Sequence, residues 1–177
     1  MTKNTAQNKN AKNTEVWNLI TAERTALAND LAGLTDSDLA VATELPGWTA
    51  KHVLAHTVTP FLVSIPRYVF TMMRFGGNLD KTNQKFATEL VQRPAAELVH
   101  VLRDNADSQW APPGDGPDMP LTEIAVHAQD IRRAIGLPHQ VSDEAAAVIR
   151  AGAEAQKKAT PDTVAALMSR LDSATGS

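Results

Sequence analysis

Residues 120–136 read PLTEIAVHAQDIRRAIG and predict one amphipathic helix, around which we expect the rest of the chain to be arranged. Pro120 suits the first helical position, and Gly136 followed by Pro138 suits a helix end. At about 100° per residue the apolar side chains fall on one stripe, which a helical protein buries against its neighbours. That stripe consists of Leu121, Ile124, Ala128, Ile131 and Ile135.

Two polar residues of this helix point to metal chemistry. Glu123 and His127 are four residues apart, so their side chains emerge on the same face, one turn above the other. A carboxylate and an imidazole at that spacing are two ready ligands for a divalent metal. The alternative is a solvated surface pair, and the spacing alone does not choose between them. Asp130 lies one turn past His127, where it would either orient the imidazole as a hydrogen-bond acceptor or face water.

The other segments also predict helices, because their apolar residues recur with helical spacing and none shows the sustained alternation of a strand. Thr14 and Thr49 suit the N-caps of two of these helices. The fold expected is all-α, a bundle of four or five main helices with short extra ones. The expected helices span 14–33, 50–61, 67–75, 80–90, 95–103, 143–157 and 161–171.

The chain divides into three parts on composition. Residues 1–13 are mostly Asn, Lys, Thr, Gln and Ala and offer nothing to bury, so we expect a disordered tail. Residues 14–160 form the expected helical bundle, which includes a proline-rich connection at 110–120. Residues 161–177 would form a short C-terminal helix and a frayed tail.

Composition excludes several classes of function. A net charge of −3 over 177 residues provides no basic stripe for nucleic acid, and no apolar run is long enough to span a membrane. The chain has no cysteine, so disulfides and Cys-ligated zinc are excluded, and thiol chemistry would need sulfur from outside the chain. The N-terminus lacks the apolar core of a secretory signal, which makes a cytoplasmic protein the expectation.

A second expected helix carries His52 and His56, which are also four residues apart. Both lie away from the centre of its apolar side, so surface positions are the alternative to a role as ligands. If His56 joined Glu123 and His127, two histidines and one carboxylate would form a set that commonly holds zinc with one coordination position open. Such a position lowers the pKa of a bound water or thiol, and nickel, iron or cobalt would accept the same donors.

Other chemistries find less support. Arg132 and Arg133 could bind a substrate carboxylate with a guanidinium fork, although adjacent helical arginines are more often one salt-bridged and one solvated. Ser64 and Ser108 lack the glycine-flanked turn of a nucleophile elbow. The sequence has neither a P-loop nor a Rossmann glycine pattern.

Two segments resemble the mycothiol-dependent maleylpyruvate isomerase N-terminal family, which belongs to the DinB-like metal-binding four-helix bundles. The first is PGWT at 46–49, followed by VLAH at 53–56. The second runs from PPG at 112–114 through PLTE and VH to GLP at 136–138. The resemblance covers roughly residues 16–149, and it implies a down-up-up-down bundle that binds a divalent metal, usually zinc.

Carried over residue by residue, the resemblance implies His56, Glu123 and His127 as the metal ligands. It also implies mycothiol or a related low-molecular-weight thiol as cosubstrate, with the metal holding the thiolate for attack on an electrophile. The sequence departs from the family in two ways. The isomerase has an additional α/β domain after the bundle, whereas the residues after Gly136 read as helices, so isomerase activity as such is doubtful. His52 stands where the family often has an acid, which leaves the capping box incomplete and adds a competing imidazole.

Three hypotheses about function follow, and fold alone does not choose among them. The first is a metal-dependent, thiol-using transferase or isomerase-like enzyme whose catalytic residues and electrophile are not identified. The second is a DinB-like protein that binds metal or a small ligand without turnover. The third is a bundle whose site has decayed and whose helices serve as the interface of a homodimer.

Overall fold

The computed structural model describes the backbone of residues 2–112, 116–138, 141–155 and 161–172. Within these residues every regular element is a helix, and the single extended pairing is an isolated antiparallel bridge between Ala42 and Thr49. The all-α prediction is therefore confirmed. No helix in this part of the chain has both the length and the apolar character needed to cross a bilayer.

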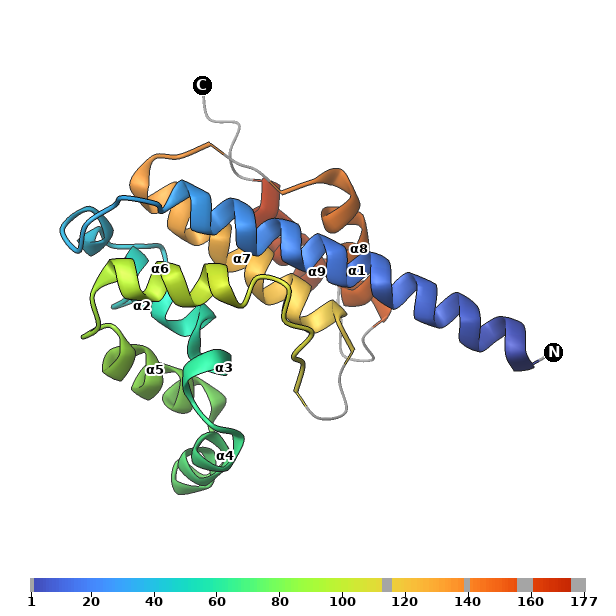
Figure 1. Cartoon of the computed structure of the whole chain (residues 1–177), viewed down its shortest axis with the longest axis horizontal. Coiled ribbons are helices and arrows are strands. Elements are labelled where there is room, and N and C mark those ends of the chain that lie inside the picture. Colours follow the sequence, from blue (N-terminus) through green and yellow to red (C-terminus); the bar gives the residue numbers. More distant parts are fainter. Residues whose placement is uncertain (1, 113–115, 139–140, 156–160, 173–177) are drawn as a thin grey trace.

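Four helices form the centre of the molecule (Figure 1). Helix α1 (Thr2–Asp30) packs along α7 (Asp118–Ile135), which packs on its other side against α2 (Ala50–Thr57). Helix α6 (Ala95–Asp104) contacts both α1 and α2 and so closes the ring. The enclosed core is aliphatic and includes Ile20, Leu27, Leu54, Leu98, Leu102, Leu121 and Ile131.

Three further helices cover this centre. Helix α5 (Leu79–Leu90) packs against α2, while α8 (Asp143–Ala155) and α9 (Pro161–Asp172) pack against α7 and against each other. Ser142 caps α8 as expected, because its Oγ accepts a hydrogen bond of 3.1 Å from the backbone N–H of Ala145. Parts of the expected 143–157 helix and of the frayed tail lie outside the described residues.

The predicted helix over 50–61 is wrong at its C-terminal end. Helix α2 ends at Thr57, and a short α3 (Thr59–Leu62) and then α4 (Ile65–Arg74) follow. Pro60 accounts for the break, because it has no N–H to donate to the carbonyl four residues earlier and its ring would clash there. The 3₁₀ turn η1 (Asp38–Ala40) is the other short element.

Helix α1 begins at Thr2 rather than after Thr14, so the first helix starts earlier than expected. The hydroxyl of Thr14 does not cap a helix but donates to the carbonyl of Asn10 within it, at 3.0 Å. Residues 2–13 contain neither proline nor glycine, and so nothing in that stretch interrupts the backbone ladder. This N-terminal part of α1 projects beyond the other helices (Figure 1).

Helix α7 starts two residues before the expected position, at Asp118, and ends where predicted. Pro120 is tolerated because the N–H groups of a helix's first turn have no intrahelical acceptor. Gly136 has a left-handed φ of 74°, which glycine adopts without strain, and its N–H closes the last turn. Helix α7 is thus one uninterrupted helix of 18 residues, and Glu123 and His127 lie within it.

Candidate metal centre

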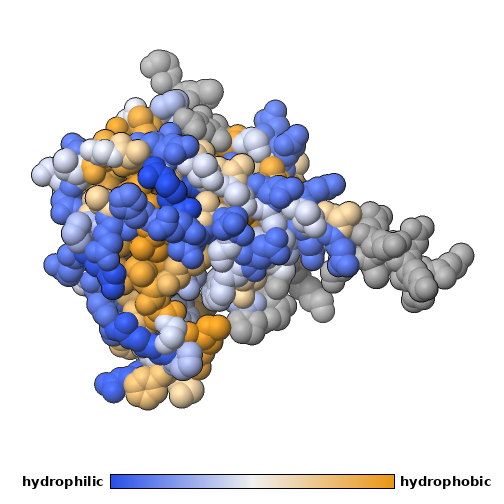
Figure 2. Space-filling view, viewed as in Figure 1, coloured by the Kyte–Doolittle hydropathy of each residue, from blue (hydrophilic) through white to orange (hydrophobic). Residues whose placement is uncertain are grey.

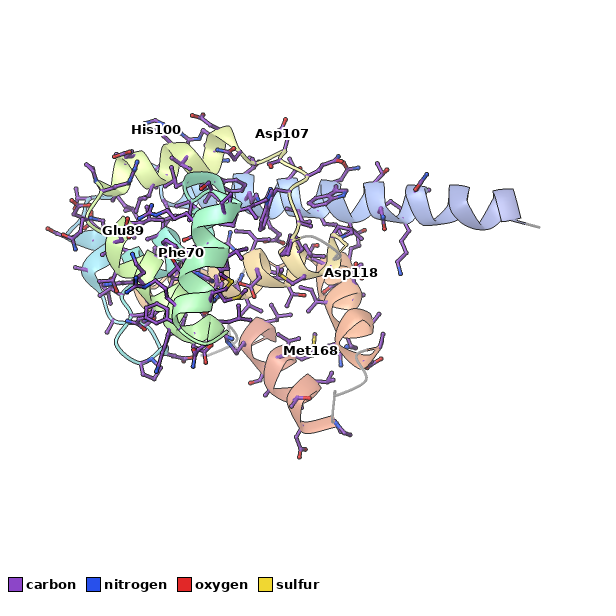
Figure 3. All side chains as sticks on the ribbon, turned by 90° about the horizontal axis from the view of Figure 1, so that it is seen from below. Phe70, Glu89, His100, Asp107, Asp118 and Met168 are labelled. Atoms are coloured by element: carbon purple, nitrogen blue, oxygen red, sulfur yellow. The ribbon has the colours of Figure 1, made fainter. Side chains whose placement is uncertain are left out.

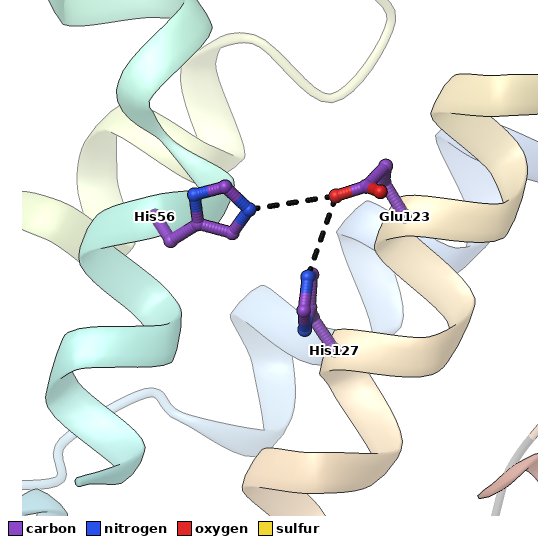
Figure 4. A group of neighbouring side chains, drawn as sticks. All are labelled: His56, Glu123 and His127. Carbon is purple, nitrogen blue, oxygen red and sulfur yellow. Dashed lines mark ion pairs between the residues drawn. The ribbon is translucent and has the colours of Figure 1, made fainter. Parts of the chain in front are cut away.

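Helices α2 and α7 bring together the three residues that the family resemblance implied as ligands. His56 lies in the last turn of α2, and Glu123 and His127 lie one turn apart on α7 (Figure 4). Oε2 of Glu123 is 3.4 Å from Nε2 of His56 and 3.3 Å from Nε2 of His127. One donor atom from each residue lies within 4.8 Å of the other two. The set therefore spans two helices that are far apart in the sequence.

The start of α2 explains where His52 goes. Oγ1 of Thr49 accepts a hydrogen bond from the backbone N–H of His52, and Nδ1 of His52 lies 3.4 Å from the backbone N of Thr49. The capping box expected to be incomplete is thus present, because an imidazole nitrogen accepts in place of a carboxylate oxygen. His52 faces the N-terminus of α2 and is not part of the candidate metal group.

His127 is oriented from behind by Asp130. Nδ1 of His127 lies 3.1 Å from Oδ2 of Asp130, whose side chain is only 1% exposed. Burial opposes ionisation of Asp130, but His127 and Arg170 outweigh this and keep the pKa of Asp130 below its usual value. With its Nδ1–H donating to this carboxylate, His127 presents Nε2 toward Glu123 and His56.

Electrostatics couple Glu123 to His127 in the absence of metal. Partial enclosure opposes ionisation of Glu123, but hydrogen bonds from His127 and His56 hold the pKa of this carboxyl well below its usual range. Burial likewise opposes the charge on His127, but Asp130 and Glu123 raise its pKa to about 9. At neutral pH the metal-free site therefore holds an ionised Glu123 and a protonated His127, and a metal would displace that proton.

Aromatic packing holds His56 in place. The ring of Trp48 meets the ring of His56 edge-on at 5.5 Å, and the ring of His127 does so at 5.0 Å. Trp48 is itself fixed by its Nε1–H, which donates to Oε1 of Gln84 on α5 at 2.9 Å. Nδ1 of His56 is buried and makes no hydrogen bond within the described part of the chain. Packing rather than a second hydrogen bond thus orients this imidazole.

The donor set fits a zinc-like ion in both chemistry and spacing. Two imidazole nitrogens and one carboxylate oxygen are common zinc ligands, with bonds of about 2.0–2.2 Å. Tetrahedral geometry with such bonds separates neighbouring donors by about 3.3 Å. The two pairs that include Glu123 are separated by 3.3 and 3.4 Å, and the two imidazole nitrogens lie within 4.8 Å of each other. The histidine side chains are 14% exposed and that of Glu123 is 52% exposed, so the group is open on the side of the carboxylate.

Neither arginine proposed for substrate binding lies in this group. Arg132 is completely buried, and its Nε and Nη2 both lie 2.8 Å from Oδ2 of Asp30 on α1. It therefore cannot receive a substrate carboxylate, and that interpretation is wrong for Arg132. Arg133 lies 2.8 Å from Glu44 through Nη1 and lines a separate pocket of about 310 Å³ together with Asp130.

Sequence reasoning missed Arg170. Its Nη2 contacts Oδ2 of Asp130, which joins α9 to the residue behind His127. No motif or spacing signals this, because the two residues are distant in the sequence and an arginine in the last turn of a helix is ordinarily explained by the helix dipole. Tyr68 is a second missed neighbour, since the charge on Glu123 adds to burial in raising the pKa of its hydroxyl.

Fold and site together define a helical-bundle protein with a candidate divalent-metal centre between two of its helices. The chain belongs to the mycothiol maleylpyruvate isomerase N-terminal domain family, whose model matches residues 20–108, about half of the chain. His56 lies inside the matched segment, whereas Glu123 and His127 lie beyond it. Comparisons with curated proteins and with solved structures found no match.

Proposed function

We propose that this protein is a DinB-like metal-binding bundle that holds a zinc ion through His56, Glu123 and His127 and uses it with mycothiol or a similar small thiol. In the proposed reaction, the thiolate attacks a small electrophile, to which the thiol is thereby transferred. The observation that carries the proposal is the meeting of three donors from α2 and α7, with Asp130 behind His127. Membership of the mycothiol maleylpyruvate isomerase N-terminal domain family supports the choice of thiol.

The residues around the site support this chemistry. A divalent metal bound there would lower the pKa of a thiol and hold the resulting thiolate. Glu123 supplies a negative charge, Asp130 fixes the tautomer of His127, and Trp48 holds the ring of His56. Because the chain has no cysteine, the sulfur must come from a second molecule, which enters from the exposed side of Glu123.

Metal analysis of protein purified without a histidine tag tests the site. We expect about one equivalent of zinc in the wild type, and strong loss in His56→Ala and in His127→Ala, because each removes one of three protein donors. His100→Ala is the matched control, since His100 is an exposed histidine on α6 outside the group. Equal zinc in the wild type, the two ligand variants and the control would refute the site.

Thiol turnover is tested separately. Zinc-loaded protein is incubated with mycothiol and a panel of small electrophiles, and thiol consumption is compared with that of His127→Ala. Consumption well above this background supports the enzyme. A protein that binds zinc but consumes no thiol with any electrophile would instead be the non-catalytic binding protein of the second hypothesis.

A further inference from the structure

Helix α9 lies on the side of the molecule opposite α6, where Met168 and Leu171 anchor it in the core (Figure 3). Arg170 on the same helix makes a polar contact with α7. The guanidinium Nη2 of Arg170 contacts Oδ2 of Asp130, the same oxygen that lies 3.1 Å from Nδ1 of His127. One carboxylate oxygen on α7 therefore joins the C-terminal helix to a proposed metal ligand.

A second contact fixes the geometry of this connection. Nη2 of Arg133 donates to the backbone carbonyl of Arg170 at 3.0 Å, so α7 also holds the backbone from which Arg170 extends. Nη1 of Arg133 is 3.9 Å from the other oxygen of Asp130. The buried Asp130 thus has an imidazole on one side and guanidinium groups on the other, and its carboxylate has little freedom to rotate.

We infer that Arg170 is a positioning residue of the metal centre, which acts on zinc affinity through Asp130 and His127; this inference rests on the proposed function. Hydrogen-bonded groups behind a metal-bound histidine set its tautomer, its ring orientation and its basicity. Replacing such a group commonly lowers metal affinity by about 10- to 100-fold. Without Arg170, Oδ2 of Asp130 loses the guanidinium that helps to hold it beside Nδ1 of His127, and the imidazole is oriented less firmly.

Zinc dissociation constants of the full chain, obtained by competition with a chromophoric chelator, test the inference. We expect Arg170→Gln to weaken zinc binding by about 10-fold or more and Arg170→Lys to restore part of the loss. Arg150→Gln is the matched control, because Arg150 is an exposed arginine on the neighbouring α8. Its affinity should equal that of the wild type.

A double-mutant cycle separates positioning from a merely structural role. If Arg170 acts through Asp130, then Arg170→Gln adds nothing to the loss that Asp130→Asn causes. Urea unfolding of the zinc-free variants reports any general destabilisation, which would leave the zinc affinity of the folded protein unchanged. Wild-type affinity in Arg170→Gln, or additive losses in the double variant, would overturn the inference while leaving the proposed metal site standing. A wild type that binds no zinc would instead refute the proposed function.

Independently of the metal site, α4 presents an apolar surface. Tyr68 faces α5, where its ring stacks on Phe86 at 5.6 Å, yet the opposite side of α4 is also apolar. Phe70 is 58% exposed and Met73 is 64% exposed. Helix α4 lies at the lower edge of the molecule in Figure 1, and Figure 2 shows apolar surface in the same region. We define the α4 face as the exposed side chains of Ile65, Val69, Phe70 and Met73.

This face is unusual for a helix on the surface of a monomer. A helix that is apolar on most sides is ordinarily buried, and a ten-residue helix is only marginally stable without packing. From the exposed fractions of its four members, the α4 face presents roughly 400 Å² of surface. A standard protein interface buries about 800 Å² on each partner, so the α4 face supplies about half of it, and the exposed Phe75 and Leu79 that follow α4 in the sequence would add to it.

We propose that the α4 face binds the α4 face of a second copy of this chain. Ile65 and Met73 lie four residues on either side of Val69, so antiparallel pairing about a two-fold axis at Val69 places Ile65 of each copy against Met73 of the other. Arg67 and Arg74 lie on another side of the helix, outside this seam. A net charge of −3 and only two arginines on α4 disfavour an anionic membrane as the occupant.

Sedimentation velocity at several protein concentrations tests the dimer. We expect a dimer for the wild type and a monomer for Met73→Glu, because the substitution buries a charge at the seam. Val41→Glu, which changes an exposed apolar residue at the end of η1, should remain a dimer. The proposal would be overturned by a monomeric wild type or by a Met73→Glu variant that is still a dimer. It would also be overturned if the wild type bound anionic phospholipid vesicles but did not dimerise.

Discussion

The high pKa of His127 makes the stability of the metal-free protein depend on pH in a defined direction. In the unfolded chain a histidine titrates near 6.5, whereas Asp130 and Glu123 raise the pKa of His127 to about 9 in the folded protein. This difference corresponds to about 3 kcal/mol of unfolding free energy. The contribution is fully present below pH 6.5 and is lost as the pH rises through 9.

The stabilisation that zinc confers should depend on pH in the opposite direction and offset this loss. A metal ligand must be the neutral imidazole, so zinc competes with the proton on Nε2 of His127 and binds more tightly as the pH rises. Over the same interval in which the zinc-free protein loses stability, the additional stability conferred by a fixed zinc concentration should increase.

Urea unfolding at several pH values between 6 and 9.5 measures both effects, once with a chelator and once with zinc. His127→Gln serves as the reference, and subtraction of its curve removes the titration of all other groups. We expect the chelated difference curve to fall by about 3 kcal/mol across this range. A difference curve that stays flat with chelator would refute the ion pairs inferred around His127. If the unfolding free energy measured with zinc fell with pH as steeply as that measured with chelator, displacement of the His127 proton by the metal would be refuted.

Three further predictions concern residues that hold the site in place. Arg132→Met should lower the unfolding free energy by about 3–5 kcal/mol, because it removes the buried cationic partner of Asp30, which is only 17% exposed, and of the buried Glu23; a thermal midpoint within a few degrees of the wild type would contradict this. Gly136→Ala should destabilise the protein by about 1 kcal/mol, because alanine is strained at a φ of 74°, and chemical denaturation checks it. Thr49→Ala should destabilise α2 by about 1 kcal/mol through loss of the capping box with His52, visible as faster amide exchange in that helix.

Several helix boundaries could be predicted from sequence because they depend on neighbouring residues. Gly136 ends α7 as expected, since only the local backbone conformation is involved. The predicted helix over 50–61 extends too far because apolar periodicity continues through Phe61, although Pro60 removes a backbone donor near its end. Helix α1 begins earlier than predicted because residues 2–13, although polar, contain no residue that breaks a helix.

The candidate site shows a sharper division. Spacing along one helix predicts that Glu123 and His127 share a face, but it leaves open whether Asp130 orients the imidazole or faces water. The structure shows Oδ2 of Asp130 beside Nδ1 of His127. Spacing along α2 could not decide whether His52 or His56 is the third ligand, because the two histidines are four residues apart on the same helix. His52 instead closes a local capping box, a role that a histidine performs only when its rotamer allows it.

Local sequence was thus sufficient for the helical class, for most helix ends and for the pairing of Glu123 with His127, because each depends on residues within about one turn. The packing of α2 and α9 against α7 supplied the rest. It brought His56 to Glu123, set Arg170 on Asp130, and buried Arg132 against α1 rather than leaving it for a substrate. These contacts join residues distant in the sequence, and their distances follow from how core side chains pack, which no spacing along one helix encodes.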